Sequence, residues 1–376
     1  MKESPDWTGY EVGPIRPPSE ANSLLLRITR NCPWNKCTFC GLYKGERFST
    51  RSVDDVKRDI DQIKTWTDYF RLSDEIDGMP EHAPSSEGGW APQIAEHWHH
   101  SGMRSIFLQD ANSLVIKPER MIEILKYLRE CFPGTERITS YARSHTIAGI
   151  SNEHLADISA AGLNRIHIGL ESACDKVLEL VKKGVDKQTH IDAGRKIKKA
   201  GIELSEYYMP GIGGREFSEC NALETADALN RINPDFIRIR TLGLPDGIPL
   251  VEDYENGTFT RTNDVEMIEE LLLMIKNLDG ITSFLKNDHI LNMLPELKGR
   301  FPEDKPQMIA VMEKFLNLSE EDQMIFRVGR RTGRLVLLES LEDEDKKNAV
   351  QGVIEQHGIN QSNVYEICDN LMKRFI

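Results

Sequence analysis

Apolar runs and helical segments alternate along this chain from residue 22 to residue 250. Six runs rich in apolar residues predict β-strands over residues 24–30, 104–110, 137–142, 165–171, 202–209 and 235–242. Helical patterns fill the intervals, with N-terminal signals at Ser52, Pro118 and Ser151. Strands separated by helices are expected to pair in parallel through right-handed crossovers. The sequence therefore predicts an α/β fold, a doubly wound sheet or a barrel, with its site at the carboxyl ends of the strands.

Three segments lie outside this alternation. Residues 1–21 form an N-terminal extension, and residues 66–103 form a polar insertion within the central region 22–250. An insertion of this length is typical of lids and binding loops. Residues 251–376 form a C-terminal helical region, in which helices are expected over 264–278, 283–294, 305–317 and 342–373.

The composition is typical of a globular enzyme, because 39% of the 376 residues are hydrophobic and 28% are charged. No apolar run approaches the roughly 20 residues that a membrane-spanning helix needs. Residues 1–20 lack the apolar core of a signal peptide. We therefore expect a cytoplasmic protein with no membrane partner. Thiols are kept reduced in the cytoplasm, and an odd number of cysteines, seven, also disfavours a disulfide framework.

The net charge of −13 disfavours nucleic acid as a partner, because phosphates are neutralised by many Lys and Arg side chains. The segment RVGRRTGR, with Arg327, Arg330, Arg331 and Arg334, is the candidate for a local basic patch. Two interpretations of this segment are open: an ion-paired or solvated stretch, and a phosphate-binding site.

The segment CPWNKCTFC places Cys32, Cys37 and Cys40 on a loop directly after the first predicted strand. Structural zinc usually takes four Cys or His ligands in two pairs. This loop offers one CxxC pair and a third thiol. A 4Fe-4S cluster takes one thiolate per iron, so three cysteines leave one iron open to a further ligand. The absence of a fourth nearby thiol therefore favours a cluster over a zinc site.

The strand, the three-cysteine loop with Phe39 before its last cysteine, and the βα units that follow resemble the radical S-adenosylmethionine (AdoMet) superfamily. The resemblance covers roughly residues 22–250. Most members have three residues between the first two cysteines, whereas this chain has four, Pro33-Trp34-Asn35-Lys36. The resemblance implies a partial (β/α)6 TIM-like barrel, a 4Fe-4S cluster bound by the three cysteines, and AdoMet bound to the open iron.

The resemblance also assigns AdoMet-binding residues to successive strand ends. The family usually has a Gly-Gly-Glu-like turn that meets the methionine amino group, and here Gln109-Asp110-Ala111-Asn112 stands in its place, with Asp110 as the acceptor. Phe39 is expected against the adenine, and Glu171 at the ribose hydroxyls or the ammonium. The remaining candidates also stand at strand ends: Ala111, Asn112, Ser140, Tyr141, Gly211, Gly213 and Leu244.

The function that the resemblance implies is reductive cleavage of AdoMet to a 5′-deoxyadenosyl radical, which abstracts a hydrogen atom from a small-molecule substrate. Reduced flavodoxin or ferredoxin is the expected electron donor. The sequence identifies neither the substrate nor the catalytic residues. Cys174 is a candidate hydrogen-atom donor or a buried apolar residue. The alternative is a zinc-stabilised α/β module that binds nucleic acid or protein without catalysis.

Overall fold

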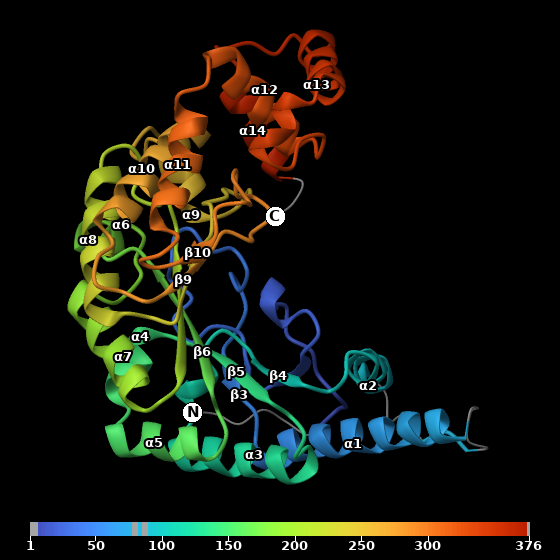
Figure 1. Cartoon of the computed structure of the whole chain (residues 1–376). Helices are drawn as coiled ribbons and strands as arrows, with labels where there is room; N and C mark the ends of the chain where they lie inside the picture. Colours follow the sequence, from blue (N-terminus) through green and yellow to red (C-terminus); the bar gives the residue numbers. More distant parts are fainter. Residues whose placement is uncertain (1–6, 77–81, 85–88, 374–376) are drawn as a thin grey trace. The chain divides into compact units, whose positions relative to one another are not determined.

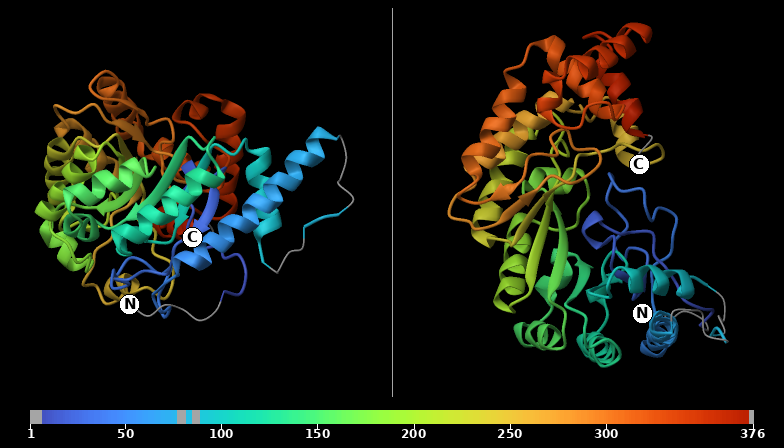
Figure 2. Two further views of the ribbon diagram at one scale, coloured as in Figure 1. Left: turned by 90° about the horizontal axis from the view of Figure 1, so that it is seen from below. Right: turned by 45° about the vertical axis from the view of Figure 1, so that its right-hand side comes forward.

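The computed structural model describes residues 7–76, 82–84 and 89–373 (Figure 1, Figure 2). The chain divides into two compact units. The first comprises Met1–Asn35, Leu42–Ile168 and Asp192–Leu204, and the second comprises Lys36–Gly41, Gly169–Ile191 and Ser205–Ile376. This division differs from the sequence-based boundaries at residues 21 and 250, which stay a prediction. None of the described helices has the length and apolar character that a bilayer span requires.

The first unit is built on parallel strands. They are β1 (Leu24–Arg27), β4 (Ser105–Gln109), β5 (Arg137–Ala142) and the start of β6 (Arg165–Glu171). The register pairs Leu26 with Leu108, and Leu108 with Ser140. Every residue of β4 is buried, as expected for a parallel strand covered on both faces. A short antiparallel pair, β2 (Thr29–Arg30) and β3 (Ser49–Thr50), joins the two chain segments that flank the cysteine loop.

Helices α1 (Val53–Glu75), α3 (Pro118–Cys131) and α5 (Asn152–Ala160) pack one beside the next in this unit (Figure 1). Two of the predicted helix starts are capped as the sequence indicates, because the hydroxyls of Ser52 and Ser151 accept hydrogen bonds from backbone N–H groups three residues later. The unit also contains α4 (Ser144–Gly149), the later part of α7 (Lys187–Lys199), and 3-10 turns at Pro18–Glu20 and Ser113–Val115.

The predicted insertion 66–103 is largely helical where the structure describes it. Helix α1 continues to Glu75, and α2 (Ala91–His100) packs against α1 (Figure 2). Trp98 of α2 is fully buried, and its indole N–H donates to the carbonyl of Ser105 at 2.8 Å. Residues 77–81 and 85–88 lie outside the described residues. The role of this insertion as a lid stays a prediction.

The second unit continues the strands and holds most of the C-terminal helices. The strands are β7 (Glu203–Tyr208), which starts in the first unit, β8 (Phe236–Ile239), β9 (Phe284–Lys286) and the antiparallel β10 (Gly299–Arg300). The helices are α6 (Asp175–Leu180), α8 (Ser218–Ile232), α9 (Pro249–Glu255), α10 (Asp264–Asn277), α11 (Lys305–Leu316), α12 (Glu320–Arg331), α13 (Glu344–Gln356) and α14 (Val364–Met372), with a 3-10 turn at Leu338–Glu342.

The hydrogen-bonded strand order is β1-β4-β5-β6-β7-β8-β9-β10. The first six of these strands are the six that the sequence predicts, and they follow one another in chain order. A doubly wound sheet reverses its order at a switch point, whereas a barrel sheet does not. The order therefore confirms the predicted α/β class with a partial (β/α)6 barrel topology, followed by a C-terminal helical region.

Two helices predicted for the C-terminal region were wrong in detail, and one helix was not predicted. The helix expected over 283–294 is absent, because Phe284–Lys286 pairs with β8 as strand β9. The helix expected over 342–373 is two helices, α13 and α14, separated by a turn at Gly358. Helix α12 was not predicted, because its segment EEDQMIFRVGRR has few apolar residues and its inward face includes two arginines.

Those arginines belong to the RVGRRTGR segment. Arg327 and Arg331 are buried and form ion pairs with the buried carboxylate of Asp264 at 3.1 and 2.5 Å. Arg330 donates to the backbone carbonyls of Asn292 and Met293. Burial raises the pKa of Asp264, but the charges of Arg331 and Arg327 outweigh it and bring this pKa below its ordinary value. The ion-paired interpretation of the segment is therefore favoured over a phosphate-binding site.

Replacing Asp264 by Ala is expected to lower the free energy of unfolding by about 3–5 kcal/mol, because two buried guanidinium groups lose their counter-charge. The effect should be largest above pH 4. The lowered folded-state pKa means that the stabilisation is present above the unfolded pKa and is lost as the pH falls through the folded one. Urea denaturation measures it. Lys314→Ala, which breaks an exposed pair with Glu342, is the control and should shift the midpoint little.

Candidate functional site

The three cysteines of the loop are half-buried, and none of them forms a disulfide bond. Cys32 belongs to the first unit, and Cys37 and Cys40 belong to the second. The backbone N–H of Asn35 points at the Cys32 sulfur at 3.4 Å, a contact that suits a thiolate. Among the described residues, no three His, Cys, Asp or Glu side chains are grouped to hold a single metal ion. Three thiolates, one for each of three irons, are the donor set that the predicted 4Fe-4S cluster requires.

The expectation that the chain has no disulfide was wrong at one place. Cys174 and Cys220 form a disulfide with a Cα–Cα distance of 5.7 Å. Their sequence separation of 46 residues gave no spacing signal. In this state Cys174 has no thiol hydrogen, so it is not a hydrogen-atom donor.

Candidate residues of the first unit lie at the carboxyl ends of β4 and β5. Asn112 is buried, and its side chain binds Thr146 and the backbone N–H of Arg143, so it connects the end of β4 to the start of α4. Ser140 is fully buried, and its hydroxyl donates to the Tyr141 carbonyl. The Tyr141 ring packs edge-on against Phe107. Ala111 is half-buried and follows Asp110 directly.

Asp110 is enclosed by protein groups. Its carboxylate accepts hydrogen bonds from the Arg27 guanidinium, the Asn31 backbone N–H and the Tyr43 hydroxyl. Burial raises the pKa of Tyr43, and the nearby charges of Asp110 and Cys32 raise it further, so this phenol stays a proton donor. The structure thus brings Asp110 and the start of the cysteine loop together. Tyr43 was missed by the sequence analysis, because a tyrosine in a polar loop carries no distinguishing pattern.

In the second unit, Thr38, which lies between Cys37 and Phe39, forms backbone hydrogen bonds through both its N–H and its carbonyl, as a residue in a β-strand does. The Thr38 N–H donates to the Val181 carbonyl, and the Thr38 carbonyl accepts from the Leu250 N–H, both at 3.0 Å. Phe39 packs on an apolar cluster that includes Leu244 and Ile212. The structure therefore brings together Phe39, which is predicted to contact the adenine, and Leu244, which is predicted to line the adenine site.

Glu171 ends β6 beside this cluster. Its backbone has φ of 63°, which non-glycine residues rarely adopt. One carboxylate oxygen pairs with the Lys183 ammonium at 3.2 Å, and the other is buried without a partner among the described residues. Lys183 also lies 5.7 Å from the Phe39 ring centroid. Lys183 was not predicted from the sequence, because a lysine in the polar stretch VKKG carries no distinguishing pattern.

Glu270 of α10 holds the loop that contains Gly211 and Gly213 through hydrogen bonds. This fully enclosed carboxylate accepts hydrogen bonds from Tyr208 at 2.6 Å, the Gly211 N–H at 3.1 Å, Ser218 at 2.6 Å and Asn221 at 2.7 Å. Gly211 has φ of +83°, and a Cβ there would approach the Thr262 hydroxyl to 2.6 Å. The glycines therefore allow the loop to take this path.

A buried acid that the sequence analysis did not single out lies on the neighbouring strand. Glu206 of β7 is 1% exposed, and neither of its carboxyl oxygens has a partner in the described part of the chain. Burial raises its pKa well above the ordinary value. The positive charge of Lys183 opposes this rise, and the negative charge of Glu171 adds to it.

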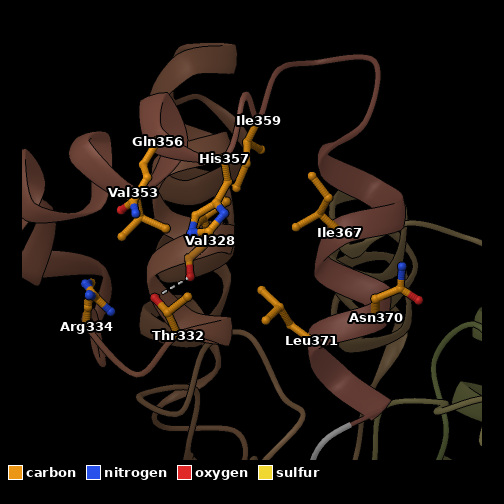
Figure 3. A pocket seen from close by; sticks show the side chains of 10 residues that line it. All are labelled: Val328, Thr332, Arg334, Val353, Gln356, His357, Ile359, Ile367, Asn370 and Leu371. Atoms are coloured by element: carbon orange, nitrogen blue, oxygen red, sulfur yellow. Dashed lines mark hydrogen bonds between the residues drawn. The ribbon is translucent and has the colours of Figure 1, made fainter.

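A cavity of about 490 Å³ lies among α12, α13 and α14 (Figure 3). Apolar side chains such as Val328, Ile367 and Leu371 line it, together with His357. In Figure 3 Ile367 and Leu371 point from α14 toward the facing helices. Of the RVGRRTGR arginines only Arg334 lines this cavity, and none of the predicted site residues does. The cavity is therefore separate in sequence from the candidate site.

Comparison with known families found a match for part of the chain. Residues 91–226 match the model of the Radical SAM superfamily, whose members are enzymes that use a 4Fe-4S cluster and AdoMet. This match covers less than half of the chain. The matched span contains the ends of β4, β5, β6 and β7 but begins after the cysteine loop, so the radical SAM cluster motif with its four-residue spacing stays a prediction.

The chain is similar to two curated proteins named tRNA uridine(34) acetyltransferase. The protein from Methanocaldococcus infernus is 25% identical over 120 residues, which cover 32% of this chain and 22% of the relative. The protein from Methanocaldococcus jannaschii is 25% identical over 113 residues, 29% of this chain and 20% of the relative. The chain thus matches about a fifth of the length of these relatives.

Among solved structures, the chain is similar to coproporphyrinogen III oxidase (HemN) from Escherichia coli, with a TM-score of 0.42 and 13% identity over 64% of this chain and 49% of that one. It is also similar to Elp3 from Methanocaldococcus infernus, with a TM-score of 0.40 and 15% identity over 60% of this chain and 52% of that one. Both likenesses are distant.

Replacing Glu206 by Gln is expected to stabilise the protein at high pH. Because the folded-state pKa of Glu206 is raised, the folded state holds this proton more tightly than the unfolded state, so stability falls as the pH rises from the unfolded pKa toward the folded one. The glutamine removes this fall of the free energy of unfolding with pH, which is at most about 1.4 kcal/mol per pH unit. Urea denaturation between pH 5 and pH 8 measures it.

The matched control for this substitution is Glu355→Gln, at an exposed position of α13. It should leave the dependence of stability on pH unchanged. Equal slopes in the wild-type protein and in Glu206→Gln would show that Glu206 is ionised in the folded state.

Proposed function

We propose that Cys32, Cys37 and Cys40 bind the 4Fe-4S cluster and that this enzyme cleaves AdoMet reductively to abstract a hydrogen atom from a small-molecule substrate. The observation that carries the proposal is the set of three half-buried cysteines on one loop, none of which takes part in the Cys174–Cys220 disulfide. The loop backbone is anchored in both of its halves, by Asn31 in the first unit and by Thr38 in the second.

The AdoMet contacts follow from the same residues. Phe39 and Leu244 offer apolar surface to the adenine, and the backbone at Gly211 and Gly213 lets the base approach closely. The unpartnered oxygen of Glu171 is an acceptor for ribose hydroxyls or the ammonium group. We assign further contacts at the first-unit strand ends to Ala111, Asn112, Ser140 and Tyr141.

When bound and reduced, the cluster and AdoMet supply a carbon-centred radical that can take a hydrogen atom. The chain's own contribution is to hold the cofactors and to exclude water. The apolar cluster around Phe39 contains Val177, Met209 and Leu242, all nearly fully buried, and such a dry wall suits a reactive intermediate. Lys183 neutralises part of the charge of Glu171 and so fixes which of its oxygens is free.

The partners are a small-molecule substrate and an electron donor, for which we propose reduced flavodoxin or ferredoxin. The names of the relatives refer to tRNA, so nucleic acid must be weighed as a second substrate class. Three of the four arginines in the basic stretch are occupied by Asp264 and by backbone carbonyls, which removes the best phosphate-binding candidate. We therefore propose a small molecule as the substrate.

Replacing Cys32, Cys37 or Cys40 singly by Ala is expected to abolish cluster binding. Anaerobically reconstituted wild-type protein should contain roughly four irons per chain, with matching sulfide, and each variant far less. Formation of 5′-deoxyadenosine from AdoMet with dithionite should disappear in parallel. Cys131→Ala removes a free cysteine outside the loop and should keep both properties. Stoichiometric zinc in the wild-type protein, or full iron in any loop variant, would contradict the proposal.

Replacing Glu171 by Gln is expected to weaken AdoMet binding while leaving the iron content unchanged. A hydrogen bond to a charged acceptor contributes about 1.5–3 kcal/mol, which corresponds to roughly a ten- to hundredfold rise in the dissociation constant. Equilibrium dialysis with labelled AdoMet measures this constant. Glu216→Gln, an exposed change in the β7–α8 loop, is the control. An unchanged constant in Glu171→Gln would remove Glu171 from the site.

A further inference from the structure

The carboxylate of Asp110 is fully buried and has protein donors on both oxygens. One oxygen accepts from Arg27, through Nε at 3.2 Å and Nη2 at 2.9 Å, and from the backbone N–H of Asn31 at 3.1 Å. The other oxygen accepts from the Tyr43 hydroxyl. The guanidinium offsets the cost of burying the charge, and charge-assisted hydrogen bonds of this kind are the strong ones.

Two of these donors flank the cysteine loop. Asn31 directly precedes Cys32, and Tyr43 follows Cys40 by three positions. One carboxylate, contributed by the end of β4, therefore ties down both ends of a loop that lies 67 and 79 residues away in sequence. The β2–β3 pair closes the same segment further out, through Arg30 and Ser49. The loop ends are thus fixed by contacts within the protein.

The additional residue between Cys32 and Cys37 is accommodated by contacts with the segment that contains Tyr43. Asn35 has φ of 47° and turns the chain back, so that its side-chain amide donates to the Tyr43 carbonyl at 2.5 Å. The Lys44 ammonium donates to the Asn35 carbonyl at 3.0 Å. Tyr43, held by Asp110, is therefore the point to which the longer half of the loop is attached.

The carboxylate is also closed to an incoming ammonium group. Gly13 of the N-terminal extension lies against it, and a Cβ at Gly13 would approach the Asp110 oxygen to 3.0 Å. Gln109 fixes this segment by accepting from the Gly13 N–H at 2.9 Å and donating to the Gly13 carbonyl. An AdoMet ammonium would have to displace Arg27 or Tyr43 from Asp110. This differs from the role that the family resemblance implies.

We infer that Asp110 is a positioning residue for the cluster loop, holding Asn31 and Tyr43 so that the four-residue spacing still presents Cys32 to the cluster, and that it is not the acceptor of the AdoMet ammonium. The inference rests on the proposed function of Cys32, Cys37 and Cys40 as cluster ligands. Groups that orient metal ligands typically contribute about 10- to 100-fold to metal affinity.

The test compares Asp110→Asn with the wild-type enzyme after anaerobic reconstitution. Iron should be released to a chelator about 10- to 100-fold faster in the variant, while the dissociation constant for AdoMet in the cluster-containing fraction stays within about twofold, a difference well below 1 kcal/mol. Tyr43→Phe removes one donor and should change iron release in the same direction by less. Normal iron retention with much weaker AdoMet binding in Asp110→Asn would overturn the inference.

Asp59→Asn is the matched control for general destabilisation. Asp59 is also fully buried in the first unit, and its side chain contacts Arg51 and Trp7, which lie outside the cysteine loop. Iron release as fast in Asp59→Asn as in Asp110→Asn would overturn the inference, because loss of stability would then explain both.

Limited proteolysis of the apoprotein separates this inference from the proposed function. Cleavage between Asn31 and Tyr43 should be faster in Asp110→Asn than in the wild-type protein and in Asp59→Asn, because the loop ends are held by contacts within the protein. A wild-type protein without iron and sulfide would overturn the proposed function, and the cleavage rates would still decide whether Asp110 holds the loop. Equal rates in all three proteins would overturn the inference.

Discussion

Parallel strand pairing is the constraint on which the arrangement of the candidate site depends. A parallel strand cannot be joined to its neighbour by a tight turn, so each strand must return through a crossover. The loops after the strands then leave from the carboxyl ends of the strands. In the first unit Asp110 and Tyr141 stand at these strand ends, and in the second unit Glu171 and the glycine loop do. Side chains with no common sequence motif are thereby placed at strand ends within each unit.

Buried carboxylates then hold the loops that follow the strands. Asp110 holds the ends of the cysteine loop, and Glu270 holds the glycine loop through four donors. Asp264 does the same for α12 through two arginines. In each case one charged group is removed from water, and its cost is offset by several donors from segments far apart in sequence. Such a carboxylate allows few alternative conformations of these segments, because any donor that moves away leaves a buried charge incompletely paired.

The elements that the sequence predicted well are those with strong local signals. The six strands have apolar runs, and the helix starts at Ser52 and Ser151 have hydroxyl caps, so local chemistry was enough to place them. The candidate site was predicted through residue types at strand ends, and the structure brings Phe39 and Leu244 into one apolar cluster as expected. Strand β9 was predicted as a helix because three residues are too few to show a period of two, and β8 decides their conformation.

The sequence by itself determined the α/β class, the six strands and the three cysteines on a loop after the first strand, because these depend on local patterns and on which residue follows which strand. Only the tertiary structure decided which hydrogen-bond and ion-pair partners the polar side chains have. Asp110 looks like a ligand acceptor in sequence, and in the fold it is occupied by Arg27, Asn31 and Tyr43. The Cys174–Cys220 bond, the Lys183–Glu171 pair and the buried Glu206 were equally invisible. The physical reason is that a hydrogen bond, an ion pair or a disulfide depends on distances between side chains, and those distances exist only once remote segments have packed.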